Sequence, residues 1–210
     1  PYNTARQFKT LDVMSHGRAG WNAVTTSDPL VAANYGQEIA PRPERYERAH
    51  ETIQIAQALW GSWEKDAWIK DPATSQFADA GKIQPINLQG KHVASRGPLP
   101  IPPSEQGQPV VFQAGDSEQG RDLGAAIGEG IFTHAASLEA GQAFYRDLKG
   151  RAAALGRDPD HIVILPGQRV IVGDTDADAR ELEREFHTND HGFDQALAEL
   201  GRSFAWHDFR

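Results

Sequence analysis

The segment 115–121 (Gly-Asp-Ser-Glu-Gln-Gly-Arg) has the residue types of an anion-binding turn. It follows an apolar run at 109–114 and opens a helical pattern at 118–127, where free backbone N–H groups and the helix dipole attract a phosphate. A plain turn between a strand and a helix, with Ser117 as the N-cap, explains the same residues, and the spacing leaves both interpretations open. A serine-hydrolase elbow is excluded, because its G-x-S-x-G pattern requires glycine where Gln119 stands.

A second group of polar residues ends a short strand pattern at 19–25. Asn22 and Thr25 stand near its tip, where polar side chains are either satisfied by the fold or directed at a ligand. The side chains of a strand alternate between its two faces, so these two residues point in opposite directions. Both can therefore serve one ligand only if the strand ends or bulges before Thr25.

Two segments imitate metal sites. The acidic run at 174–185 has the spacing of a calcium loop, but Ala179 stands at the sixth position, where the sharp turn requires glycine. Its acidic residues are better explained as favourable charges in the first turn of a helix. His187 and His191 have the i, i+4 spacing of a metalloprotease helix, but Thr188 replaces the glutamate that this pattern requires. We predict no metal site.

The elements that must position these residues alternate between short apolar strands and amphipathic helices. This alternation indicates an α/β fold with a parallel sheet, in which ligands bind at the carboxyl ends of the strands. The expected helices cover 3–15, 43–60, 118–127, 138–155 and a charged stretch from about 175, and the expected strands cover 19–25, 109–114, 130–133, 161–165 and 169–172.

Residues 64–108 differ from the rest of the chain, because prolines punctuate them and helical patterns are absent. A small hairpin is expected at 86–93. An irregular region of this length inside a compact protein is usually a functional insertion or a linker. With Trp60, Trp63 and Trp68 near its start, we expect either a lid or a subunit interface.

Charge, cysteine content and hydropathy exclude several classes of protein. The 21 basic and 29 acidic residues give a net charge of −8 without a lysine-rich run, which argues against nucleic acid or an anionic membrane as partner. Cysteine is absent, which excludes disulfides, thiolate zinc sites and cysteine nucleophiles and fits a cytoplasmic location. No apolar run approaches the roughly 18 residues that span a bilayer.

Several motifs occur in the order in which one enzyme family has them. They are TLDVMSHGRAGWNAVTT at 10–26, RYERAHE at 45–51, LWGSW at 59–63, GPLP at 97–100, QAGDSEQGR at 113–121 and ILPG at 164–167. Up to about residue 180 the chain resembles the flavin-dependent monooxygenases related to nitrilotriacetate monooxygenase. These enzymes form a branch of the bacterial-luciferase-like superfamily.

The resemblance implies a (β/α)₈ TIM barrel that binds reduced FMN (FMNH₂) delivered by a separate NAD(P)H:flavin reductase. Such an enzyme reacts with O₂ and inserts one oxygen atom into a small organic substrate, and a homo-oligomer is expected. A non-catalytic flavin or phospholigand binding protein on the same fold is the alternative. A phosphosugar-binding enzyme that uses the 115–121 turn is a third reading.

The resemblance also implies roles for particular residues, although it assigns no catalytic residue. Asn22 and Thr25 match positions that line the flavin ring. Arg42 lies one helical turn before Tyr46, where relatives often carry histidine. The implied cofactor-binding residues are Asn22, Thr25, Arg42, Tyr46 (phosphate or ribityl chain), and Ser117 and Glu118 (phosphate turn).

Members of this family are roughly twice as long as this chain. We therefore expect residues 1–210 to be the middle part of one luciferase-like barrel domain, with an irregular insertion at about 64–108. A barrel must close on itself to remove its sheet edges. The segment alone is accordingly expected to form a partial barrel and to be inactive.

Overall fold

The computed structural model describes residues 1–188, 197 and 201, and it divides into two compact units. The first unit holds residues 1–25 and 41–167, and the second holds 26–40 and the described residues from 168 onward. His191, the second histidine of the metal-like spacing, lies outside the described residues. Among the described helices, none combines the length and the apolar character needed to cross a bilayer.

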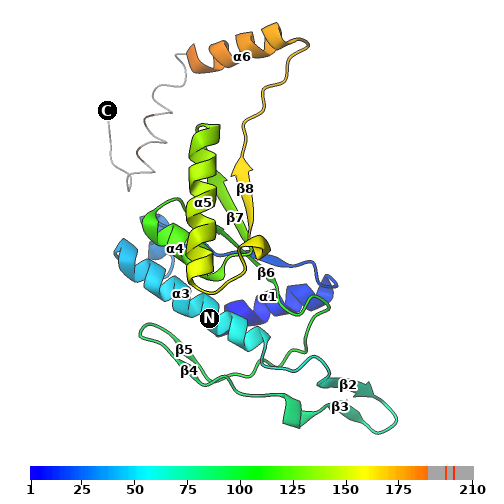
Figure 1. The fold of residues 1–210 in the computed structure, drawn as a ribbon. Helices are drawn as coiled ribbons and strands as arrows, with labels where there is room; N and C mark the ends of the chain where they lie inside the picture. Colours follow the sequence, from blue (N-terminus) through cyan, green and yellow to red (C-terminus); the bar gives the residue numbers. More distant parts are fainter. Residues whose placement is uncertain (189–196, 198–200, 202–210) are drawn as a thin grey trace. The chain divides into compact units, whose positions relative to one another are not determined.

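A parallel sheet forms the centre of the first unit (Figure 1). Its strands stand in the order β1 (Gly20–Asn22), β6 (Val110–Ala114), β7 (Gly130–His134) and β8 (Val163–Gly167). Each neighbouring pair is parallel. The predicted parallel sheet is confirmed, although β1 ends earlier than the pattern at 19–25 predicted and β8 lies further along the chain than 161–165.

Four helices pack on one face of this sheet. They are α1 (Tyr2–Met14), α3 (Arg42–Trp60), α4 (Glu118–Ile127) and α5 (Leu138–Ala154), as the patterns at 3–15, 43–60, 118–127 and 138–155 predicted. Val111 of β6 joins the core residues of α3 and α4, and Ile131 of β7 joins those of α4 and α5. Both side chains are completely buried, so alternate residues of each strand hold the helices in place.

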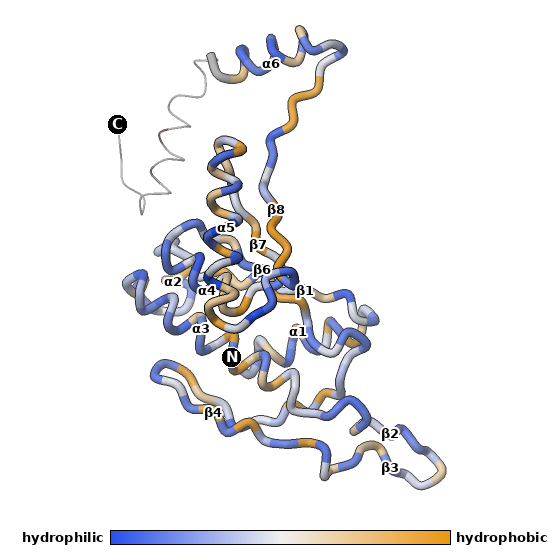
Figure 2. The backbone as a smooth tube through the Cα atoms, viewed as in Figure 1, coloured by the Kyte–Doolittle hydropathy of each residue, from blue (hydrophilic) through white to orange (hydrophobic). Residues whose placement is uncertain are grey.

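The opposite face of the sheet is apolar and open within the first unit. Phe132 and Leu165 are register partners on this face, and they are 42% and 43% exposed. Val163, two residues before Leu165, points the same way and is 56% exposed. Figure 2 shows the hydrophobic character of this part of the sheet. In a closed barrel, side chains on such a face form the interior.

The predicted insertion at 64–108 contains two small antiparallel hairpins. One pairs β2 (Trp68–Asp71) with β3 (Gln76–Ala78), and a short helical turn, η1 (Ala80–Lys82), follows it. The other pairs β4 (Leu88–Gln89) with β5 (Ala94–Ser95). The hairpin predicted at 86–93 is therefore present, with its second strand slightly later in the chain.

The β4–β5 hairpin is fixed to α3 by a carboxylate. Glu51 accepts hydrogen bonds from the amides of Lys91 (2.9 Å), His92 (2.8 Å) and Val93 (3.1 Å). Glu47, one helical turn earlier, binds the Lys91 ammonium (2.7 Å) and the His92 ring (3.0 Å). The backbone donors, first that of His92, hold the pKa of Glu51 below its usual value.

The second unit contains α2 (Pro29–Ala33) and α6 (Asp176–Thr188), and α6 confirms the helix expected from about 175. The hydroxyl of Thr175 accepts a hydrogen bond from the Asp178 amide at 3.2 Å and so caps this helix. The strand expected at 169–172 is wrong. Val170 and Val172 are 77% and 80% exposed, and no described strand pairs with this segment. An apolar run becomes a strand only where a partner strand supplies the ladder.

Loss of the Glu51 carboxylate should release the β4–β5 hairpin from α3. We expect Glu51→Ala to accelerate hydrogen exchange of the amides of Lys91, His92 and Val93 at neutral pH. Gln54→Ala, at an exposed position of the same helix, should leave them protected.

The pH dependence of this protection has a defined sign. Folding lowers the pKa of Glu51, so its contribution is complete above its ordinary value of 4.5 and is lost as the pH falls through the folded value. The protection factors of the same amides, which compare each rate with the intrinsic exchange rate at that pH, should therefore decline in the wild type as the pH falls below about 4.5. Equal protection of wild type and Glu51→Ala at every pH would contradict this assignment.

Candidate functional site

The tip of β1 lies at the carboxyl edge of the sheet. Asn22 is the last residue of the strand and the register partner of Phe112, and its side chain is exposed. The Ala23 amide still donates to the Phe112 carbonyl at 2.8 Å, and regular pairing ends there. The strand thus stops before Thr25, which meets the condition for both residues to serve one ligand. The Thr25 carbonyl accepts a hydrogen bond from Arg45 Nη1 at 2.6 Å, which ties this tip to α3.

Tyr46 of α3 reaches the turn between β6 and α4. A Cβ atom added to Gly115 would lie 3.4 Å from the Tyr46 hydroxyl and 2.6 Å from Gln113 Nε2. A Cβ on Gly120 would lie only 2.8 Å from the Gly115 carbonyl oxygen. The two glycines therefore let the turn fold closely onto the start of its own helix. Two segments that the sequence placed in the site separately, at 45–51 and 113–121, meet here.

The first turn of α4 offers donors to an anion. The Ser117 hydroxyl accepts a hydrogen bond from the Gly120 amide at 3.2 Å, and the Ser117 carbonyl accepts one from the Arg121 amide at 2.9 Å. Helix geometry leaves the first amides without intrahelical acceptors, and among the described residues none accepts from Glu118 or Gln119. These two amides and the positive end of the helix dipole can hold an oxyanion.

Gln113 begins the 113–121 motif, but the sequence predicted no role for its side chain. Its side chain is 3% exposed, and its Oε1 has no hydrogen-bond partner among the described residues. It lies beneath α4, between Gly115 and Gly124. The only signal in the sequence is a glutamine at a helix-facing position of the apolar run Val-Val-Phe-Gln-Ala at 110–114. A buried polar atom without a partner marks a place where the structure has room for an interaction.

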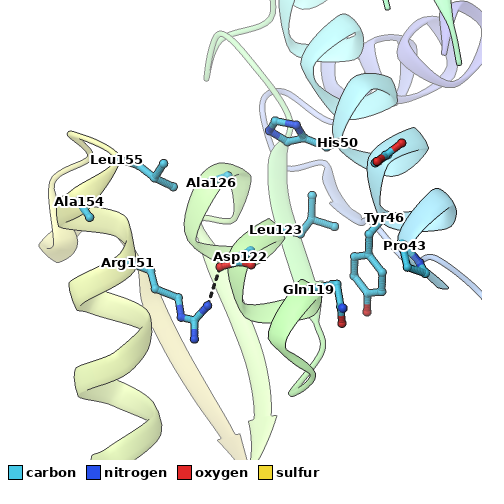
Figure 3. Close-up of a pocket in the computed structure, with 11 residues that line it drawn as sticks. Pro43, Tyr46, His50, Gln119, Asp122, Leu123, Ala126, Arg151, Ala154 and Leu155 are labelled. Atoms are coloured by element: carbon cyan, nitrogen blue, oxygen red, sulfur yellow. Dashed lines mark hydrogen bonds and ion pairs between the residues drawn. The ribbon is translucent and has the colours of Figure 1, made fainter. Parts of the chain in front are cut away.

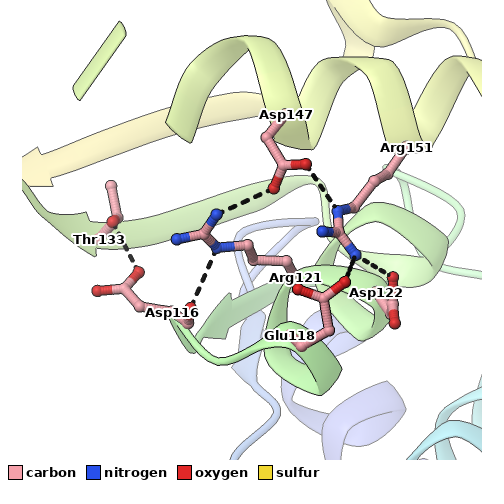
Figure 4. Close-up of polar contacts among 7 residues, drawn as sticks. All are labelled: Asp116, Glu118, Arg121, Asp122, Thr133, Asp147 and Arg151. Carbon is pink, nitrogen blue, oxygen red and sulfur yellow. Dashed lines mark hydrogen bonds and ion pairs between the residues drawn. The ribbon is translucent and has the colours of Figure 1, made fainter. Parts of the chain in front are cut away.

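The Glu118 side chain is directed elsewhere. Its carboxylate lies 2.8 Å from Arg151 Nη1 of α5, which also contacts Asp122 at 2.6 Å, while Arg151 Nε contacts Asp147 at 3.0 Å (Figure 4). Ion pairing with three carboxylates raises the pKa of Arg151, first through Glu118. Glu118 can therefore contribute its backbone amide to an anion site, whereas its carboxylate belongs to the α4–α5 contact.

Arg42 and Tyr46 occupy different surroundings although they stand one turn apart on α3. Arg42 is exposed at the start of the helix, and its side chain makes no hydrogen bond or ion pair with a described residue. Tyr46 is partly buried beside the turn. Geometry thus places Tyr46 at the turn and leaves Arg42 on the surface.

A groove of about 630 Å³ runs over α4 between α3 and α5 (Figure 3). Leu123 and Ala126 form its apolar floor, and Tyr46 and Leu155 stand on the flanking helices. This groove lies on the helix-covered side of the sheet, so it is separate from the open face. Tyr46 lines the groove with its ring and places its hydroxyl at the Gly115 turn.

The profile of the luciferase-like monooxygenase family matches residues 1–207. This match covers nearly the whole chain. The chain belongs to the luciferase-like monooxygenase family. The family resemblance drawn from the motifs is confirmed, and the sheet described above is part of a luciferase-like TIM barrel.

Individual relatives agree with this assignment. The chain is 44% identical to N-acetyl-S-(2-succino)cysteine monooxygenase of Bacillus subtilis over 88% of this chain and 42% of the relative. It is 41% identical to nitrilotriacetate monooxygenase component A of Aminobacter aminovorans over 86% and 40%, respectively. A crystal structure of riboflavin lyase with modified FMN and riboflavin superposes with a TM-score of 0.86 and 32% identity, covering 98% of this chain and 45% of the other. The chain spans less than half the length of these relatives.

Within this luciferase-like chain, the close packing of the β6–α4 turn can be tested by adding one methyl group. We expect Gly120→Ala to lower the free energy of unfolding by about 1–3 kcal/mol, because the new Cβ would meet the Gly115 carbonyl. In α5, no described atom outside the neighbouring helix backbone would lie within 4 Å of a Cβ added to Gly150, so Gly150→Ala should instead raise the free energy of unfolding by up to about 1 kcal/mol through helix propensity. Denaturant unfolding of both variants measures the difference. Equal effects would show that the turn does not depend on this contact.

Proposed function

We propose that the protein is an FMN-dependent monooxygenase of the two-component type. It takes reduced FMN from a separate NAD(P)H:flavin reductase and inserts one oxygen atom from O₂ into a small organic substrate. The observation that carries the proposal is the β6–α4 turn of a luciferase-like barrel. Around it lie a tyrosine hydroxyl, two amides that no described residue accepts from, and a buried glutamine whose Oε1 has no partner in the described part of the chain. Reduced FMN, when bound, supplies the activation of oxygen.

The phosphate end of the flavin fits the turn. The amides of Glu118 and Gln119 and the hydroxyl of Tyr46 are donors at one helix N-terminus, and phosphate is the ligand that such a terminus favours. Ser117 keeps the first turn in place by capping Gly120. The relative crystallised with modified FMN supports a flavin phosphate as this anion.

The ring end of the flavin is assigned to the tip of β1. Asn22 presents an amide on the open face, and Thr25 follows the end of the strand, so both can line a planar polar ring. The apolar residues Phe132 and Leu165 on the same face serve to keep water from the reacting ring. Arg42 is included only as a positive charge at the start of α3.

The partner and the setting are part of the same proposal. One relative is named as component A, which supports a separate component that reduces the flavin. The absence of cysteine supports a cytoplasmic location. A homo-oligomer with the 64–108 region as a subunit interface is included in the proposal, and such an interface would cover the exposed side chains of Ile69 and Phe77 in the β2–β3 hairpin.

A non-catalytic flavin or phospholigand binding protein on the same fold is the second candidate. It is favoured by one observation: the anion turn is complete in this chain, while the open sheet face is uncovered within its unit. Residues 1–210 alone should therefore show no oxygenase activity.

Removal of the Tyr46 hydroxyl tests the phosphate assignment. We expect Tyr46→Phe in the intact protein to weaken FMN binding by about 0.5–1.5 kcal/mol and to leave riboflavin binding unchanged, because riboflavin lacks the phosphate. Tyr145→Phe, at a half-exposed position of α5, should change neither. Tryptophan-fluorescence quenching measures both affinities. An equal loss of affinity for FMN and for riboflavin would assign the Tyr46 hydroxyl to the ribityl chain and not to the phosphate.

Formation of an oxygenated product separates the enzyme from the binding protein. Intact protein, FMN, NADH and a flavin reductase should give an oxygenated product from an organic acid or sulfur compound in a substrate panel. FMN binding without any oxygenated product across the panel would favour the binding protein. No binding of FMN in either redox state would refute both candidates.

A further inference from the structure

The first turn of α4 carries its own carboxylate, Glu118, next to the amides assigned to the phosphate. A carboxylate in the first turn of a helix is attracted to the helix N-terminus. There it would occupy the donors and repel an incoming phosphate. A phosphate site at this turn therefore requires that the Glu118 carboxylate be held away from it.

Helix α5 shows where a first-turn carboxylate lies when nothing withdraws it. In the first turn of α5, the backbone amide of Glu139 and the Ser137 hydroxyl lower the pKa of the Glu139 carboxyl. The Glu139 carboxylate is thus stabilised by groups at the start of its own helix. In α4 the first-turn carboxylate, Glu118, directly follows the N-cap and lies on Arg151 instead, at 2.8 Å (Figure 4).

The position of Arg151 is fixed by contacts other than Glu118. Asp122 and Asp147 bind its guanidinium at 2.6 and 3.0 Å. The second oxygen of Asp147 pairs with Arg121 Nη1 at 3.1 Å, and Arg121 Nε donates to the Asp116 carbonyl at 3.1 Å. Arg151 is held on α5 by these partners, so it can anchor Glu118 there.

We propose that Arg151 is a positioning residue for the phosphate site, which keeps the Glu118 carboxylate off the N-terminus of α4. It acts through Glu118 and does not touch the flavin. The inference rests on the proposed FMN function and adds a residue of α5 to the determinants of phosphate recognition.

The test is a double-mutant cycle in the intact protein, read by tryptophan-quenching titrations with FMN and with riboflavin. Arg151→Gln should weaken FMN binding about tenfold by freeing Glu118, and riboflavin binding should not change. Glu118→Gln should bind FMN at least as tightly as wild type. The double variant should return to within about twofold of Glu118→Gln, because no carboxylate is left to release.

Two further variants control for folding and for charge. Asp122→Asn removes a charge beside Arg151 but keeps an acceptor oxygen, and the Asp147 and Glu118 contacts stay in place, so FMN affinity should stay near the wild-type value. If Arg151→Gln unfolds, Arg151→Lys keeps the charge without the forked geometry, and its smaller loss should also be reversed by Glu118→Gln.

Three results would overturn the inference. Parallel loss of FMN and riboflavin affinity in Arg151→Gln would make Arg151 a structural residue. A double variant as weak as Arg151→Gln would mean that Arg151 acts on the phosphate directly. A wild type that does not distinguish FMN from riboflavin would refute the phosphate site itself, and with it this role of Arg151.

Discussion

At the end of β6 the chain turns back so tightly that the backbone at Gly115 touches the backbone at Gly120. A side chain at either position would separate the turn from its helix, because a Cβ atom added to Gly120 would lie only 2.8 Å from the Gly115 carbonyl oxygen. The same turn receives the Tyr46 hydroxyl from α3 and covers the buried Gln113 amide. Everything assigned to the anion depends on this contact, because it sets where the first amides of α4 point.

The sheet below this turn is covered by helices on one side and is apolar on the other. Val111 and Ile131 pack against the helices. The exposed apolar side chains of the other face are Phe132, Val163 and Leu165. This division follows from strand alternation, and it is the division between the outer layer and the interior of a barrel. The β6–α4 turn belongs to the helix layer, which is well packed within this chain. The proposed function assigns the flavin ring and the substrate to the open face.

Part of the fold could be predicted from local sequence patterns. The Gly-Asp-Ser-Glu-Gln-Gly run predicted a turn at the start of a helix, and the sequence pattern located α1, α3, α4 and α5. The end of β1 could not be read from 19–25, because it is set by where pairing with β6 stops, at the Ala23 amide. For the same reason the apolar segment 169–172 was mistaken for a strand.

Long-range contacts account for the remaining differences in the site. The sequence predicted that Glu118 belongs to the phosphate turn. Its carboxylate is paired with Arg151 on another helix, and no local sequence pattern reveals this pairing. Gln113 begins the 113–121 motif, and the structure adds that its side chain is buried and that its Oε1 has no partner among the described residues. The flavin-lining roles of Asn22 and Thr25 stay predictions that rest on the resemblance and on their place at the sheet edge.

A crystal structure of the intact protein with FMN tests the central claim most directly. The account predicts that the phosphate oxygens lie within hydrogen-bonding distance of the Glu118 and Gln119 amides and of the Tyr46 hydroxyl. The Glu118 carboxylate should remain on Arg151. A phosphate bound at another strand–helix turn, or a Glu118 side chain lying across the α4 N-terminus in the complex, would contradict it.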